Sequence, residues 1–238
     1  MLFADETKGA TSLRLDGKGQ LGTSILDHWQ LTQEELDEIV AANPSLRGMM
    51  LGYVREYKLR KIWFSDARLT NVRKEDDHDR TQKGDLWFTY RGVDIIVEVK
   101  SLQTHTVKST TEGYTGKFQC DASDRRLVVF PNGESVQTTC LRVGEFDLLA
   151  VGLFEFGQQW RFAFAKNLDL PHTRYKKYKV EWREHLLATM IDITLPLQSP
   201  FQAEPWILLD AIVQAKQSGF IAAVADDTTA KPLDTPVE

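Results

Sequence analysis

The chain has 238 residues, of which 26% are charged and 42% are hydrophobic, and its formal net charge is −5. These fractions are ordinary for a globular protein, and the length fits one large domain or a domain with appendages. The negative balance excludes an overall cationic coat, but it leaves room for a local basic groove.

Cys120 and Cys140 are the only cysteines of the chain. They are too few for a zinc site without help from histidine, and no Cys-x-x-Cys or His-x-His spacing accompanies them. We interpret them as free core thiols and expect a reducing, cytoplasmic location. No apolar run approaches the length of a membrane span and the N-terminus lacks a secretory apolar core, so no membrane partner is expected.

Residues 1–31 show no clear pattern and are interpreted as an N-terminal extension. Thr32 and Glu35 then form a capping box, which predicts a helix over Gln33–Ala42. Asn43-Pro44 ends this helix. Its buried stripe should consist of Leu36, Ile39 and Val40.

A second helix is predicted from about Ser45 to Trp63, with Pro44 in its first turn. Its apolar side would contain Leu46, Met49, Met50, Val54, Tyr57 and Ile62. The same helix is basic, which would suit phosphate contact, through Arg55, Lys58, Arg60 and Lys61. Glu56 lies in this stretch, and one interpretation is an i, i+4 salt bridge with Arg60.

Residues 64–83 are polar and densely charged. The run Glu75-Asp76-Asp77-His78-Asp79 resembles a cluster of metal ligands, but such runs are more typical of a solvated, mobile loop, which we favour. Because the segment leads directly to Asp85, it could close over bound nucleic acid.

Gly84–Ser101 is predicted to form two strands joined by a tight turn at Arg91-Gly92. Successive side chains of a strand face opposite sides. One side of the second strand is therefore aliphatic, with Val93, Ile95, Val97 and Val99, and the other carries Asp94, Ile96, Glu98 and Lys100.

Glu98 and Lys100 thus share one face of a very apolar strand, where an ion costs several kcal/mol unless it is paired or bound to a metal. Asp85, at the start of the preceding strand, is the natural third member of a polar site. Asp followed by Glu-x-Lys also occurs by chance, and the pair could face water on an edge strand. The four β-branched residues on the opposite face favour a buried, catalytic strand.

The order of Asp85, a hairpin and then Glu98-x-Lys100 resembles the motif of the PD-(D/E)xK nucleases, the superfamily of type II restriction endonucleases. The resemblance is strongest over roughly residues 44–166, and Gly84 stands where the motif has proline. It implies that Asp85 and Glu98 bind Mg²⁺, for which Mn²⁺ can substitute, and that Lys100 acts on the attacking water. It also implies a catalytic contribution from Glu56, double-stranded DNA as substrate, and a homodimer that cuts both strands.

Ser101–Asp124 has poor hydrophobic periodicity, and we predict a loop with little regular structure. Its position after Lys100 suits a segment that contacts DNA, although each residue could equally belong to an ordinary surface loop. The candidates for DNA contact are Lys108, Lys117, Gln119, Arg125 and Arg126.

A β-hairpin is predicted from Leu127–Phe130 and Ser135–Leu141, because Asn132-Gly133 supplies the positive φ of its turn. Strands over Phe146–Phe154 and Trp160–Ala165 should follow. Asp147 could be a second acidic contact, but a capped or salt-bridged aspartate is the preferred interpretation.

His172–His185 is the most basic stretch of the chain. Lysine and arginine neutralise phosphates and release counterions, so we favour nucleic-acid contact over a solvated loop or helix end. The basic residues are Arg174, Lys176, Lys177, Lys179 and Arg183, and they alternate with Tyr175, Tyr178 and Trp182.

A closing helix over Ala203–Ser218, with Gly219 as its C-terminal cap, and a disordered tail over 223–238 complete the chain. The sequence therefore predicts an α/β fold with a restriction-endonuclease-like core: a nuclease domain over 32–200, with a central mixed β-sheet flanked by helices and an added β-hairpin, followed by a C-terminal helix within 201–222.

The predicted function is a Mg²⁺-dependent endodeoxyribonuclease of restriction type. One alternative is a catalytically inactive nucleic-acid-binding module on the same fold. A further alternative is a protein-interaction or sugar-binding domain whose acidic residues are coincidental.

Overall fold

The computed structural model describes residues 14–15, 21–22, 24–74 and 84–219. The acidic run at 75–79 and the predicted tail at 223–238 lie outside this part of the chain. Two compact units are present, Met1–Val54 and Arg55–Glu238, and the division between them falls inside helix α3 (Pro44–Ile62). No helix among the described residues is long and apolar enough to cross a membrane.

The smaller unit contains the short antiparallel strands β1 (Arg14–Leu15) and β2 (Leu21–Gly22), and helices α1 (Ile25–Trp29) and α2 (Gln33–Ala42). The predicted capping box of α2 is confirmed. Its predicted buried stripe is wrong: neither α1 nor α2 contributes a buried residue, and Ile39 is exposed.

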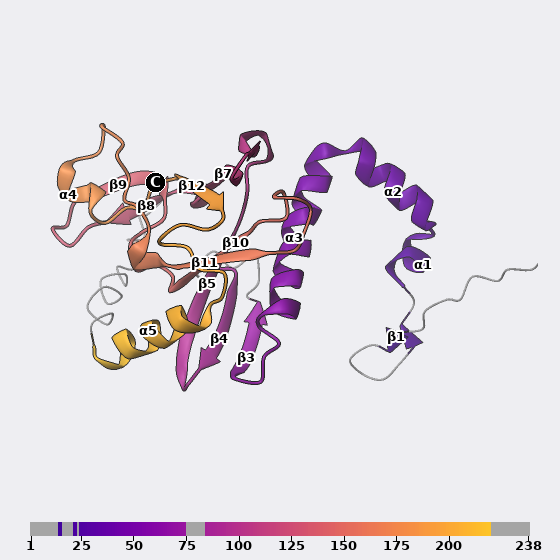
Figure 1. Cartoon of the computed structure of the whole chain (residues 1–238), viewed down its shortest axis with the longest axis horizontal. Coiled ribbons are helices and arrows are strands. Elements are labelled where there is room, and N and C mark those ends of the chain that lie inside the picture. The colour runs from indigo at the N-terminus through magenta and orange to yellow at the C-terminus, as the bar shows by residue number, and fades with distance from the viewer. Residues whose placement is uncertain (1–13, 16–20, 23, 75–83, 220–238) are drawn as a thin grey trace, which may run out of the picture. The chain divides into compact units, whose positions relative to one another are not determined.

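The larger unit is built on a five-stranded sheet, β11-β10-β5-β4-β3 (Figure 1). Its strands are β3 (Leu69–Lys74), β4 (Leu86–Tyr90), β5 (Val93–Ser101), β10 (Leu148–Gly152) and β11 (Phe162–Lys166). Only β5 and β10 are parallel, so the predicted central mixed sheet is confirmed. Arg91 and Gly92 both have positive φ, 50° and 76°, as the predicted tight turn between β4 and β5 requires.

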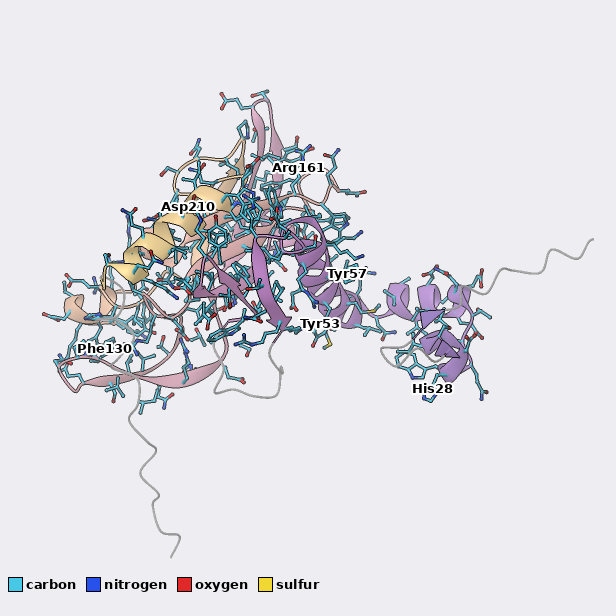
Figure 2. All side chains as sticks on the ribbon, turned by 90° about the horizontal axis from the view of Figure 1, so that it is seen from below. His28, Tyr53, Tyr57, Phe130, Arg161 and Asp210 are labelled. Atoms are coloured by element: carbon cyan, nitrogen blue, oxygen red, sulfur yellow. The ribbon has the colours of Figure 1, made fainter. Side chains whose placement is uncertain are left out.

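The two faces of this sheet have different cover. On one face, Ile95 and Val97 pack with α5 (Trp206–Gln217) and with Leu59 of α3, so flanking helices are present there. Asp210 of α5, labelled in Figure 2, accepts a hydrogen bond from the Tyr90 hydroxyl at 2.8 Å. On the other face, Ile96 packs against a second core, to which strands β7 and β12 contribute. The predicted alternation of β5 is therefore confirmed.

The prediction of an irregular loop over Ser101–Asp124 is wrong. This segment forms a short 3₁₀ turn (Thr104–Thr106), β6 (Lys108–Thr110), β7 (Gly113–Gln119) and the start of β8 (Asp121–Val129). Strand β7 pairs with β6 and with β12 (Met190–Leu195). Of the residues of β7, only Gly116 and Phe118 are buried. Because threonine and glycine occupy other positions, the sequence does not show the alternation of apolar and polar residues that predicts a strand. Segment 102–147 thus joins the parallel strands β5 and β10 with strands, where a helix is usual.

The predicted hairpin is confirmed as β8 with β9 (Ser135–Cys140), and Gly133 of its turn has φ 79°. Helix α4 (Val180–Arg183) lies beside it (Figure 1). Phe130, labelled in Figure 2, stacks on Trp182 with ring centroids 5.3 Å apart. Both cysteines are free and buried, as predicted.

The predicted apolar side of α3 is also wrong. Its buried residues are Arg55 and Leu59, whereas Met49 is 62% exposed and Tyr57, labelled in Figure 2, is 55% exposed. The helix meets the sheet along the narrow line that carries Arg55 and Leu59. Because an ion pair occupies part of this contact, hydrophobicity alone points to the wrong face.

The face of α5 gives a test of this packing. Leu209→Ala should lower the free energy of unfolding by about 3 kcal/mol, because Leu209 is fully buried and its truncation leaves a cavity. Ile207→Ala, at a side chain 80% exposed, should change it by less than about 0.5 kcal/mol. Urea denaturation of both variants measures the difference, and equal decreases would contradict the position of α5.

Candidate metal and catalytic site

Asp85 is fixed onto the backbone of β5. Its N–H donates to the carbonyl of Val97 at 2.9 Å, and its Oδ2 accepts from the N–H of Val99 at 2.6 Å. Gly84 precedes it with φ 73°, and a Cβ there would lie 2.5 Å from Cγ2 of Ile96. Proline, with φ near −65°, could not adopt this conformation, so the backbone here favours glycine where the predicted motif has proline.

Glu98 and Lys100 lie side by side on β5, where the strand pairs with β10 just beyond the end of its pairing with β4. The ammonium of Lys100 is 2.7 Å from Oε1 of Glu98 and donates to the carbonyl of Asp121 at 2.9 Å. Their side chains are 12% and 17% exposed. The alternative of an ion pair facing water on an edge strand is therefore wrong.

The electrostatics of these groups reflect their burial. Burial raises the pKa of Glu98 to about 7; Lys100 opposes this shift and Asp85 adds to it. Burial also raises the pKa of Asp85, against the effect of Lys100 and of the Val99 N–H. Burial would lower the pKa of Lys100, but the adjoining Glu98 carboxylate outweighs it and the pKa is raised. The site thus contains two carboxyl groups and one ammonium, so an additional positive charge would be stabilised there.

Glu56 of α3 forms an ion pair with Lys74 at the end of β3, at 2.7 Å, rather than with Arg60. The charge of Glu56 raises the pKa of Asp85 and that of Lys74 lowers it. The structure therefore brings Glu56 within electrostatic reach of Asp85.

The donor set can be compared with the needs of a metal ion. Within the described ranges, no group of three or more His, Cys, Asp or Glu side chains could hold a metal ion. Mg²⁺, however, is commonly held by one or two carboxylates, with waters and substrate phosphates as its other ligands. Asp85 and Glu98, both oxygen donors with raised pKa values, fit that kind of site.

Arg126, a predicted DNA contact, is instead engaged by Glu145. Both of its terminal nitrogens bond to that carboxylate, which is nearly buried, and one also donates to the carbonyl of Cys140 at 3.3 Å. The charge of Glu145 raises the pKa of Glu98, so this ion pair acts electrostatically on the site. Glu145 was not among the predicted site residues, because nothing in its local sequence marks it.

The other predicted DNA contacts lie on the surface in different settings. Lys108, Arg125, Arg174, Lys176 and Lys177 are exposed. Lys117 pairs with Asp192 at 2.8 Å, and Gln119 donates to Asp121 at 3.0 Å. Lys179 pairs with Glu134 and lies 5.0 Å from the centre of the Trp182 ring. These groups therefore belong to several elements rather than to one cluster.

Asp147 has the structural role preferred from the sequence. Its carboxylate accepts from the N–H of Ile96 at 2.8 Å and pairs with Lys216 of α5 at 2.6 Å. Together with Lys216, which also donates to the carbonyl of Asp94, it connects the first half of β5 to α5.

Comparison with known proteins does not assign the chain to a family. No family model and no curated protein matches it. Among solved structures, "The structure of a bacterial homing endonuclease: I-Ssp6803I" is similar at 19% sequence identity, over 55% of this chain and 79% of that chain, with a TM-score of 0.26. A TM-score this low supports no argument about function, which must be inferred from the site.

The raised pKa of Glu98 makes stability depend on pH. The folded protein holds this proton up to about pH 7, whereas the unfolded chain releases it at the ordinary, lower pKa. The stabilising contribution is therefore complete below the unfolded pKa and disappears as pH rises through about 7. Without divalent metal, the free energy of unfolding of the wild type should fall more steeply between about pH 5 and 8 than that of Glu98→Gln.

Urea denaturation at several pH values measures this slope. Glu112→Gln, at an exposed carboxylate, is the matched control and should follow the wild type. If Glu98→Gln has the same slope as the wild type, Glu98 does not titrate as its burial requires.

Proposed function

We propose that the protein is a Mg²⁺-dependent endodeoxyribonuclease with a restriction-endonuclease-like core. The observation that carries the proposal is the convergence of Asp85, Glu98 and Lys100 on one buried face of β5, with more negative than positive charge. A binding surface with coincidental acidic residues would have no reason to bury two carboxylates beside one ammonium, since each isolated ion costs several kcal/mol.

Asp85 and Glu98 are the proposed metal ligands, with Mn²⁺ as a substitute for Mg²⁺. When bound, the metal ion would polarise the scissile phosphate and acidify a water. Glu56 is proposed as a further member of the catalytic site. Its carboxylate pairs with Lys74 and acts electrostatically on Asp85.

Lys100 is proposed to act as a cation. Its pKa is raised by Glu98, so the ammonium keeps its proton at neutral pH and is a poor general base in that state. A fixed positive charge can orient the attacking water and stabilise the negative charge that develops on the phosphate in the transition state. We therefore favour orientation and charge stabilisation over proton removal for this residue.

Double-stranded DNA is the proposed substrate. The exposed basic residues at 174–177 supply charges that neutralise phosphates, which gives affinity independent of base sequence. A homodimer is proposed because cutting both strands of a duplex requires two active sites or two successive events.

Lys100→Ala should reduce DNA cleavage in Mg²⁺ by at least about 10²-fold, because it removes the fixed charge at the reacting phosphate. Binding of the same DNA in Ca²⁺ should change little. Plasmid nicking and fluorescence anisotropy measure the two properties, and Lys166→Ala, which removes a surface pair with Asp169, is the control.

Three outcomes of that assay are informative. Unchanged turnover in Lys100→Ala would remove Lys100 from the mechanism. Cleavage by the wild type that persists after metal chelation would contradict the metal dependence. Wild-type protein that binds DNA but does not cut it in Mg²⁺ or Mn²⁺ would favour the inactive nucleic-acid-binding module.

Replacing Lys176 and Lys177 together by alanine should weaken binding to unrelated DNA sequences by the same factor. The slope of log affinity against log salt should decrease by about 2, because each lysine would neutralise one phosphate. Anisotropy titrations at several salt concentrations measure both effects. An unchanged slope would show that this stretch does not bind phosphates.

A further inference from the structure

Arg55 of α3 is deeply buried for a cation: its side chain is only 2% exposed. Its Nη2 pairs with Oε1 of Glu155 at 2.5 Å, and its Nη1 donates to the hydroxyl of Ser101. Burial lowers its pKa, against the opposing effect of Glu155. A buried arginine is costly, so its contacts need an explanation.

The side chain of Arg55 meets the ends of both parallel strands. Ser101 is the last residue of β5, Gly152 is the last residue of β10, and the two are paired in the sheet. A Cβ on Gly152 would lie 2.2 Å from Cδ of Arg55, so the glycine makes room for the arginine. Glu155 lies in the turn that follows β10. One side chain therefore ties α3 to two strands and a turn.

The residues adjoining these contacts belong to the candidate site. Glu56 follows Arg55 on α3, and Lys100 precedes Ser101 on β5. The guanidinium thus links the backbone that carries Glu56 to the backbone that carries Lys100.

The hydrogen bonding of Arg55 argues against a purely stabilising role. In the described part of the chain, its Nε and Oε2 of Glu155 are buried without a hydrogen-bond partner. Unsatisfied buried groups cost free energy, and a buried ion pair is often no more stable than apolar residues of similar volume. The pair is therefore unfavourable as a purely stabilising contact. The planar guanidinium, however, fixes the relative positions of the groups that it binds.

We propose that Arg55 is a positioning residue for the catalytic site: it holds α3 against the ends of β5 and β10, and so places Glu56 and Lys100 around Asp85 and Glu98. The inference rests on the proposed function, because it assigns a role within the same reaction. Groups that orient metal ligands and reacting residues without touching the substrate affect metal affinity and turnover together.

Three changes perturb this contact in different ways. Arg55→Met keeps most of the volume and removes the fork, and Arg55→Lys keeps the charge with a different geometry. Gly152→Ala leaves Arg55 intact but displaces its side chain. The double variant Arg55→Met/Glu155→Met removes both partners, and serves if the single change leaves Glu155 buried and unpaired and the protein unable to fold.

Lys216→Met is the matched control. It breaks another largely buried ion pair, with Asp147, at the opposite end of β5. Its removal should reduce stability without changing the geometry around Lys100.

The measurements are urea denaturation, calorimetric titration with Mn²⁺, and the kcat and KM of DNA cleavage. Arg55→Met and its double variant should bind Mn²⁺ about 10- to 100-fold more weakly. Their kcat should fall about 100-fold, with KM for DNA nearly unchanged. Gly152→Ala should show the same pattern, Arg55→Lys should recover part of the activity, and Lys216→Met should match the wild type in kcat and Mn²⁺ affinity.

Two kinds of failure are distinguishable. If the wild type neither binds Mn²⁺ nor cleaves DNA, the proposed function is overturned and the role of Arg55 with it. If the wild type is active, but the Arg55 variants retain its kcat and Mn²⁺ affinity, or decrease them no more than Lys216→Met does, the positioning role alone is overturned.

Discussion

Two carboxylates and one ammonium, buried together on the central strand, are the constraint around which the larger unit is arranged. Glu98 lies beside β10 with its side chain only 12% exposed, and Asp85 is held against the backbone of β5. Lys100 compensates one of the two charges. Burial raises the pKa of both acids, and a divalent cation or a protonated carboxyl can relieve the remaining negative charge.

Three ion pairs lie around this centre, and each connects two elements of the larger unit. Glu56 and Lys74 connect α3 to the end of β3, Arg126 and Glu145 connect β8 to the segment before β10, and Arg55 and Glu155 connect α3 to the turn after β10. Electrostatic interactions weaken slowly with distance in a low-dielectric interior. The charges of Glu56 and Lys74 therefore act on Asp85, and the charge of Glu145 acts on Glu98.

Local chemistry and tertiary packing contributed differently to what could be predicted. The capping box at Thr32, the turn at Arg91-Gly92 and the hairpin turn at Gly133 are each determined by a few adjacent residues, and all are confirmed. Strand β7 was missed because only two of its residues, Gly116 and Phe118, are buried. The apolar side of α3 was assigned to the wrong face. The helix packs through Arg55, and a charged residue is not expected to be buried from its hydropathy.

The sequence by itself determined the hairpin, the alternation of β5 and the grouping of Asp85, Glu98 and Lys100, because spacing along paired strands decides which side chains share a face. Only the tertiary structure decided which charges neutralise one another. Glu56 pairs with Lys74 rather than with Arg60, and Arg126 pairs with Glu145 rather than extending into solvent. These partners are distant in the sequence and meet only when the sheet forms. Burial depth, and with it the pKa values of the site, also depends on contacts from every neighbouring element.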